Sequence, residues 1–204
     1  MLKVKVCGIT NLEDALYAVE AGADALGFVF WKKSPRLIDA VVAEDIIRRL
    51  PPFITIVGVF VNEDIDEVNK IAKNAGLNIV QLHGDESPEY CRGVNAKVIK
   101  AIRVRGIDDI NGLKDYNEKT CAFLLDAYVR GLPGGTGKTC NWSLAAEAKK
   151  YNRIILSGGL TPDNVKDAVN QVKPYAVDVS SGVEKSPGKK DHDKTLKFIA
   201  AAKG

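Results

Sequence analysis

Residues 2–30 read LKVKVCGITNLEDALYAVEAGADALGFVF and predict one strand–helix–strand unit. Alternating apolar residues over 2–7 indicate a strand, and Asn11 is a suitable N-terminal cap for an amphipathic helix over 11–21. A second apolar run over 25–30 predicts the next strand. A helix between two such strands is typical of a parallel α/β fold.

The same alternation of strand and helix continues to the end of the 204-residue chain. Further strands are predicted over 54–61, 78–82, 97–102, 121–125, 153–156 and 176–179. Further helices are predicted over 42–50, 65–74, 86–92, 107–116, 142–150, 162–172 and 191–202. Eight such units without a linker predict a single (βα)8 TIM barrel over residues 1–204, rather than a doubly wound open sheet.

Composition restricts the functional class. A net charge of +3 is too small to indicate nucleic-acid binding, but it suits an anionic small molecule. Cys7, Cys91, Cys121 and Cys140 have no CxxC spacing and the chain has only two histidines, so we expect no metal and no cofactor. Without an apolar leader or a membrane-length apolar run, we expect a cytoplasmic protein with no membrane contact. A monomer is slightly favoured over a homodimer.

Cys7 and Asp126 are the predicted catalytic residues. Cys7 ends the first strand, and Asp126 ends the sixth. In a parallel barrel all the strand ends surround one pocket, so the thiol and the carboxyl could serve there as general base and general acid. Each residue also has an ordinary structural alternative, because free cysteine is often a small buried hydrophobe and aspartate often caps a turn.

Alternation along the first strand determines which way Cys7 points. Lys5 and Cys7 share one face, while Val4 and Val6 share the other, where we expect the surrounding helices. Lys5 then lies one layer deeper in the barrel than Cys7. A lone buried ammonium is costly, so Lys5 needs a partner, and Asp178 on the eighth strand is the candidate.

Two glycine-bearing turns predict a phosphate site. Gly158 and Gly159 follow the seventh strand, and Ser180, Ser181 and Gly182 follow the eighth. The loops after these two strands frequently bind phosphate in such barrels, although each could be a plain strand-to-helix turn.

A third glycine-rich segment, residues 131–139, resembles a nucleotide P-loop. Leu132 stands where that motif requires glycine, so we interpret the segment as a mobile active-site loop whose Gly134 and Gly135 contact substrate.

Four further polar residues are predicted to bind substrate, together with Asp178. Arg36 lies in the loop after the second strand, Gln81 and His83 lie at the end of the fourth, and Arg103 lies just past the fifth. Solvent-exposed loop charges and a turn histidine are the alternatives for these positions.

The chain resembles the phosphoribosylanthranilate isomerase family of tryptophan biosynthesis along essentially its whole length. Eight segments in register carry the resemblance: 5–10 (KVCGIT), 22–30 (GADALGFVF), 34–36 (SPR), 58–61 (GVFV), 81–86 (QLHGDE), 134–138 (GGTGK), 157–160 (SGGL) and 178–184 (DVSSGVE). Cys140 and Asn141 before Trp142 depart from the family, which usually has an aromatic residue and an aspartate there. This departure leaves the predicted acid and base unchanged.

The resemblance implies an Amadori rearrangement of N-(5-phosphoribosyl)anthranilate. By analogy, Asp126 protonates the ring oxygen, Cys7 removes a proton from the adjacent carbon, and Arg36 binds the anthranilate carboxylate. Three other functions remain open: an isomerase for another phosphoribosyl substrate, a Schiff-base lyase using Lys100, and a non-enzymatic phospho-ligand binder. Fold alone does not separate them.

Overall fold

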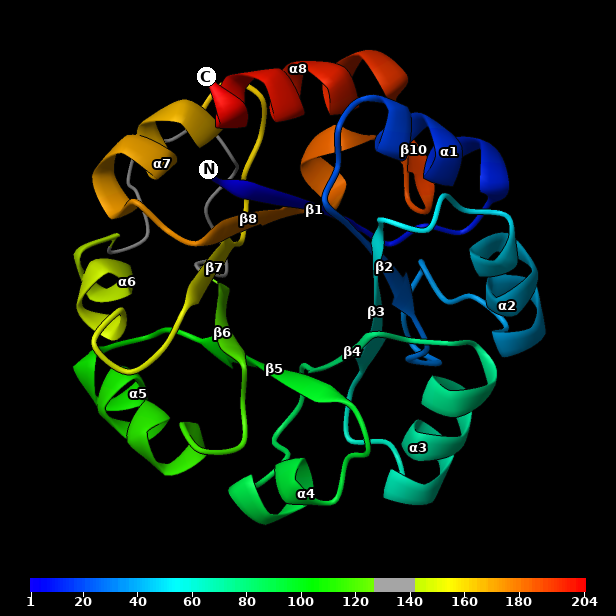
Figure 1. The fold of residues 1–204 in the computed structure, drawn as a ribbon. Helices are drawn as coiled ribbons and strands as arrows, with labels where there is room; N and C mark the ends of the chain where they lie inside the picture. The colour runs from blue at the N-terminus through cyan, green and yellow to red at the C-terminus, as the bar shows by residue number, and fades with distance from the viewer. Residues whose placement is uncertain (127–141) are drawn as a thin grey trace.

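The computed structural model describes residues 1–126 and 142–204, and its centre is a closed barrel of eight strands (Figure 1). The strands are β1 (Lys3–Cys7), β2 (Ala25–Val29), β3 (Thr55–Phe60), β4 (Ile79–Leu82), β5 (Lys97–Arg103), β6 (Ala122–Asp126), β7 (Ile154–Ser157) and β8 (Ala176–Val179). Each strand pairs in parallel with the next, and β8 closes on β1 with Lys5 opposite Asp178. The predicted TIM barrel is confirmed.

Helices surround the barrel on the outside (Figure 1). They are α1 (Leu12–Glu20), α2 (Ala40–Arg48), α3 (Ile65–Asn74), α4 (Pro88–Arg92), α5 (Ile107–Asn111), α6 (Trp142–Ala148), α7 (Val165–Val172) and α8 (His192–Lys203). Asn11 caps α1 through its side chain, as the sequence predicts. Between α7 and α8, the short 3-10 helix η2 (Ser181–Val183) leads into a hairpin of β9 (Glu184–Ser186) and β10 (Lys189–Lys190).

Several elements differ from the sequence-based assignment, and the helix predicted over 162–172, for example, begins at Val165. The helix predicted over 107–116 ends at Asn111 and continues as the 3-10 helix η1 (Gly112–Tyr116), because glycine is a poor residue for a helix interior. The helix predicted over 86–92 begins at Pro88, since Ser87 is its cap. The hairpin of β9 and β10 was not predicted at all.

Two apolar layers hold the barrel in place. The larger lies between the strands and the helices and contains the fully buried Val4 and Val6, as their alternation predicts. The smaller fills the barrel interior with Ile99, Leu124 and Ile155, among others. Polar side chains that also point into the barrel lie closer to the C-terminal ends of the strands, where they line its mouth.

Within residues 1–126 and 142–204, no helix is long and apolar enough to cross a membrane. The same two segments contain no cluster of three or more His, Cys, Asp or Glu residues that could hold a metal ion.

Candidate active site

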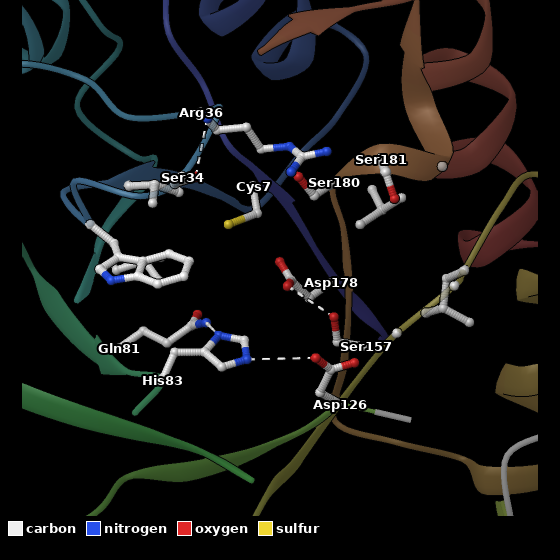
Figure 2. Close-up of a pocket in the computed structure, with 18 of the residues that line it drawn as sticks. Cys7, Ser34, Arg36, Gln81, His83, Asp126, Ser157, Asp178, Ser180 and Ser181 are labelled. Atoms are coloured by element: carbon white, nitrogen blue, oxygen red, sulfur yellow. Dashed lines mark hydrogen bonds and ion pairs between the residues drawn. The ribbon is translucent and has the colours of Figure 1, made fainter. Parts of the chain in front are cut away.

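One pocket at the C-terminal mouth of the barrel collects most of the predicted site residues (Figure 2). Its volume is about 320 Å³, within the usual range for a small-molecule site. The predicted residues that line it are Cys7, Arg36, Gln81, His83, Arg103, Asp126, Gly158, Gly159, Asp178, Ser180, Ser181 and Gly182. The predicted Gly134 and Gly135, and the whole segment 131–139, lie outside the described residues.

Cys7 sits above a buried ion pair. The Lys5 ammonium donates to Asp178 Oδ1 at 2.8 Å, so the predicted pairing is confirmed, and Ser157 Oγ donates to Asp178 Oδ2 at 3.2 Å. Burial raises the pKa of the Cys7 thiol above its ordinary value, while the neighbouring Lys5 ammonium acts in the opposite direction. In the resting pocket Cys7 is therefore a thiol, with a cation beside it that favours the thiolate.

Glycine at position 27 makes room for this arrangement. Gly27 lies opposite Cys7 in the β1–β2 ladder. A Cβ atom on Gly27 would lie 2.7 Å from Cys7 Sγ, too close for the thiol in its present position, and 3.0 Å from Lys5 Nζ, a tight contact. The absence of a side chain on β2 is thus what lets the thiol and the ammonium share this side of the barrel.

Asp126 enters the pocket from β6, and His83 reaches toward it from the end of β4 (Figure 2). His83 Nε2 lies 3.6 Å from Asp126 Oδ2, and His83 Nδ1 lies 3.2 Å from Gln81 Nε2. Gln81 is 1% exposed, and its Oε1 atom has no hydrogen-bond partner among the described residues. Three predicted site residues therefore form a continuous polar row from β4 to β6.

Arg36 lies over the other side of the pocket and is oriented by Glu184. Its Nε and Nη2 donate to the two carboxylate oxygens of Glu184 at 2.8 and 2.6 Å. This hydrogen bonding raises the pKa of Arg36. Arg36 also crosses the backbone at Gly8, where a Cβ atom would lie 2.6 Å from its Cδ. The guanidinium edge carrying Nη1 is not used by Glu184 and can donate hydrogen bonds to a second carboxylate.

Lys190 joins this corner to the strand that carries Cys7. Its ammonium donates to Glu184 Oε1 at 3.0 Å and to the backbone oxygen of Cys7. The side chain is 1% exposed, and burial lowers the pKa of Lys190. Glu184 thus accepts from two cations, and the group as a whole carries one positive charge beside the pocket.

The turns after β7 and β8 meet on the far side of the pocket from β4. Gly158 and Gly159 have φ values of 89° and 67°, which suit glycine, and neither backbone N–H donates to another described backbone group. Gly182 packs against the first turn so closely that a Cβ would lie 1.9 Å from the Leu160 oxygen. The first of these turns thus presents to one corner two amides that donate to no described backbone group, as an anion site requires.

Sequence reasoning missed several residues of the site. Trp31 and Ser157 line the pocket directly after β2 and at the end of β7, where the strand-end argument could have found both. Glu184 and Lys190 reach Arg36 and Cys7 only through the unpredicted hairpin, so no local signal identified them. Lys100, the candidate Schiff-base lysine, is 2% exposed and donates to Glu86 and to three backbone oxygens, so it offers no free amine.

Fold and site together define the class of protein: a parallel-barrel enzyme with a thiol, a carboxyl and an anion corner around one small pocket. Residues 4–201 match the family model of N-(5'-phosphoribosyl)anthranilate (PRA) isomerase. The chain belongs to this isomerase family.

The similarity extends over entire chains. A relative from Citrifermentans bemidjiense, named N-(5'-phosphoribosyl)anthranilate isomerase, is 59% identical over 100% of this chain and 98% of its own. The crystal structure of the Thermotoga maritima phosphoribosyl anthranilate isomerase is 50% identical with a TM-score of 0.93, and all of both chains is covered. A further isomerase, solved in complex with reduced 1-(o-carboxyphenylamino)-1-deoxyribulose 5-phosphate, is 48% identical with a TM-score of 0.90 and the same coverage.

Proposed function

We propose that this isomerase converts N-(5-phosphoribosyl)anthranilate to the carboxyphenylamino-deoxyribulose phosphate of L-tryptophan biosynthesis, with Asp126 as general acid and Cys7 as general base. The observation that carries the proposal is the presence of both groups in one pocket beside the amide-lined corner. Family membership and the product-like ligand of the 48% identical isomerase support the same reaction.

The proposed chemistry begins with two proton transfers, one from Asp126 and one to Cys7. Asp126 protonates the ribose ring oxygen as its bond to C1 breaks, which opens the ring and leaves an iminium at C1. The Cys7 thiolate then removes the proton from C2, and the electron pair moves toward nitrogen to give an enolamine. This enol becomes the aminoketone product by proton transfer. No net oxidation occurs, so the reaction requires no redox partner.

Anchoring groups at the two ends of the substrate would hold the sugar between acid and base. The corner formed by Gly158, Gly159 and Gly182 suits the phosphate. The free edge of Arg36 suits the anthranilate carboxylate, with Trp31 and Val59 as apolar wall for the ring.

Fluorescence of freshly prepared phosphoribosylanthranilate provides the direct test. We expect the purified protein to remove this fluorescence catalytically and to form the aminoketone. A rate equal to that without protein would contradict the proposal. Turnover of another phosphoribosyl substrate in its place would identify the related isomerase considered above.

Inorganic phosphate should raise the melting temperature of the protein as its concentration rises, because it binds only the folded corner. The Gly159→Val variant should lose this increase, since it strains the turn and puts a side chain beside the amides. Gly76→Val is a matched control: like Gly159, Gly76 has a φ of 67° and no atom of the described residues within 4 Å of its Cβ position. Gly76 lies between α3 and β4, however, at the opposite end of the barrel.

Both variants should be destabilised, and only Gly76→Val should keep the phosphate-dependent increase. If Gly159→Val keeps it in full, the phosphate site is elsewhere, with residues 131–139 as the next candidate.

Arg36→Lys should raise KM about 10-fold or more with a smaller change in kcat. Hydrogen bonds to charged groups are worth about 1.5–3 kcal/mol, and one ammonium cannot satisfy Glu184 and a substrate carboxylate as a guanidinium does. Steady-state kinetics measure both constants. Arg92→Lys, in an exposed pair on α4, is the control and should leave them unaltered. An unchanged KM in Arg36→Lys would rule out this carboxylate site.

Two further predictions concern the oligomeric state and the cellular location of the enzyme. We favour the monomer indicated by the sequence over the dimer described for a Thermotoga maritima relative, and sedimentation velocity distinguishes them. We also favour a reducing cytoplasmic location, which the free thiols of Cys7, Cys91 and Cys121 support and cell fractionation tests.

A further inference from the structure

Gln81, His83 and Asp126 form a row that the acid–base roles alone do not explain. We propose that Gln81 is a positioning residue: it fixes the proton of the His83 imidazole on Nε2, and His83 thereby determines which oxygen of Asp126 carries the transferable proton. This inference rests on the proposed role of Asp126 as general acid.

Gln81 determines the state of Nδ1. Its amide nitrogen, a donor with two hydrogens, lies 3.2 Å from His83 Nδ1. A donor facing this nitrogen requires a lone pair on it, because a second N–H there would place two donors against each other. Gln81 lies in the middle of the barrel wall and is 1% exposed, so water does not compete for this contact.

The backbone on both sides of His83 is held firmly. The His83 N–H donates to the Phe60 oxygen at 2.8 Å. The buried Lys100 ammonium binds the backbone oxygens of Leu82 and Gly84, at 3.3 and 2.7 Å. Glu86, the ionic partner of Lys100, accepts from the Gly84 N–H. A buried ion pair thus fixes the backbone from which the imidazole extends, so each tautomer of His83 presents a defined atom to Asp126.

On the other side of the ring, Nε2 faces Asp126 Oδ2 across 3.6 Å (Figure 2). This separation exceeds a hydrogen bond, and catalytic hydrogen bonds commonly shorten when substrate binds. With its proton on Nε2, His83 is a donor to Oδ2. Oδ2 must then accept, and the acidic proton of Asp126 resides on Oδ1. The wrong tautomer would present a lone pair to Oδ2 and place the proton on the oxygen beside histidine, away from substrate.

Nitrogen NMR of the substrate-free enzyme tests the first half of the proposal. The chain has two histidines, so His192→Gln identifies the His83 signals. We expect Nδ1 of His83 to be unprotonated and Nε2 protonated. In Gln81→Met, which keeps the side-chain length without a donor, both tautomers should be populated and the Nδ1 shift should move toward an average. A protonated Nδ1 in the wild type, or no change in Gln81→Met, would overturn the proposal, whatever the reaction proves to be.

A double-mutant cycle tests the second half. Gln81→Met should lower kcat about 10-fold with KM nearly unchanged, since the ground-state contacts remain. His83→Gln places an amide N–H where Nε2–H was, and this donor has no tautomer. In the His83→Gln background, Gln81→Met should therefore change kcat by less than about twofold.

The alternative is that Oε1 of Gln81, which has no partner within residues 1–126 and 142–204, binds substrate directly. Gln81→Met would then raise KM, and by the same factor in both backgrounds, which would overturn the positioning role. If His83→Gln has no measurable turnover, the tautomer of His83 measured by NMR in the wild type and in Gln81→Met decides between the two roles of Gln81.

Discussion

Asp126→Asn and Cys7→Ala will each remove nearly all turnover while leaving the affinity for a product analogue almost unchanged. A single acid–base group typically contributes about 10²–10⁴-fold, and neither amide nor methyl can transfer the required proton. Because the two groups act in one reaction, the double variant should be little worse than the slower single variant. Steady-state assays and calorimetric titration with a product analogue measure the two effects separately.

A cysteine and an aspartate outside the pocket serve as controls for these two variants. Cys91→Ala changes a buried thiol in α4, and Asp115→Asn changes an exposed carboxyl in η1. Both should keep kcat and KM close to the wild type. Turnover of either pocket variant within about threefold of the wild type would mean that its residue is not the acid or the base.

The pH dependence of Cys7 alkylation should follow the thiol. Burial raises the pKa of Cys7, so the thiol predominates at neutral pH and the thiolate increases as the pH rises. The rate at which iodoacetamide alkylates Cys7 should therefore increase from neutral to alkaline pH. Turnover requires a protonated Asp126 as well as the thiolate, so kcat/KM should not follow the alkylation curve. Peptide mapping measures alkylation at Cys7, and a rate that does not increase with pH would contradict the assigned pKa shift.

Lys5→Met will cost about 3–5 kcal/mol of unfolding free energy, because it leaves the Asp178 carboxylate buried without its cation. Lys5 is 3% exposed and Asp178 is 6% exposed. Burial by itself would lower the pKa of Lys5, but Asp178 raises it above its ordinary value, so the ammonium is charged. Urea denaturation, monitored by fluorescence, gives the free energy.

Lys3→Met on the same strand is the matched control. Lys3 pairs with Asp24 at 2.8 Å, the separation found between Lys5 and Asp178, but the Lys3 side chain is 46% exposed against 4% for Lys5. Its loss should be minor, since solvent screens the pair. Asp178→Asn added to Lys5→Met should recover much of the lost stability by removing the unpaired charge. Equal costs for Lys3→Met and Lys5→Met would contradict the assigned role of burial.

The sequence by itself determined the barrel, the direction of the side chains along the first strand and the residues at the strand ends. Local periodicity is sufficient for this, because alternation along one strand decides its faces and parallel strands bring their ends to one mouth. For the same reason the pairing of Lys5 with Asp178 was predictable, since neighbouring strands in a closed barrel fix their contacts.

Only the tertiary structure decided the contacts that depend on loop paths and on distances across the mouth. The hairpin of β9 and β10 brings Glu184 to Arg36, 148 positions away in the chain, and no periodic signal encodes such an encounter. Glycine at position 27 is explained by the space that Lys5 and Cys7 occupy beside it. The row from Gln81 to Asp126 likewise spans β4 to β6, so its hydrogen-bond directions arise from register and side-chain packing. These contacts across the mouth determine the orientation of Arg36 and, in our proposal, the tautomer of His83. The sequence pattern determines only which residues lie near enough to meet.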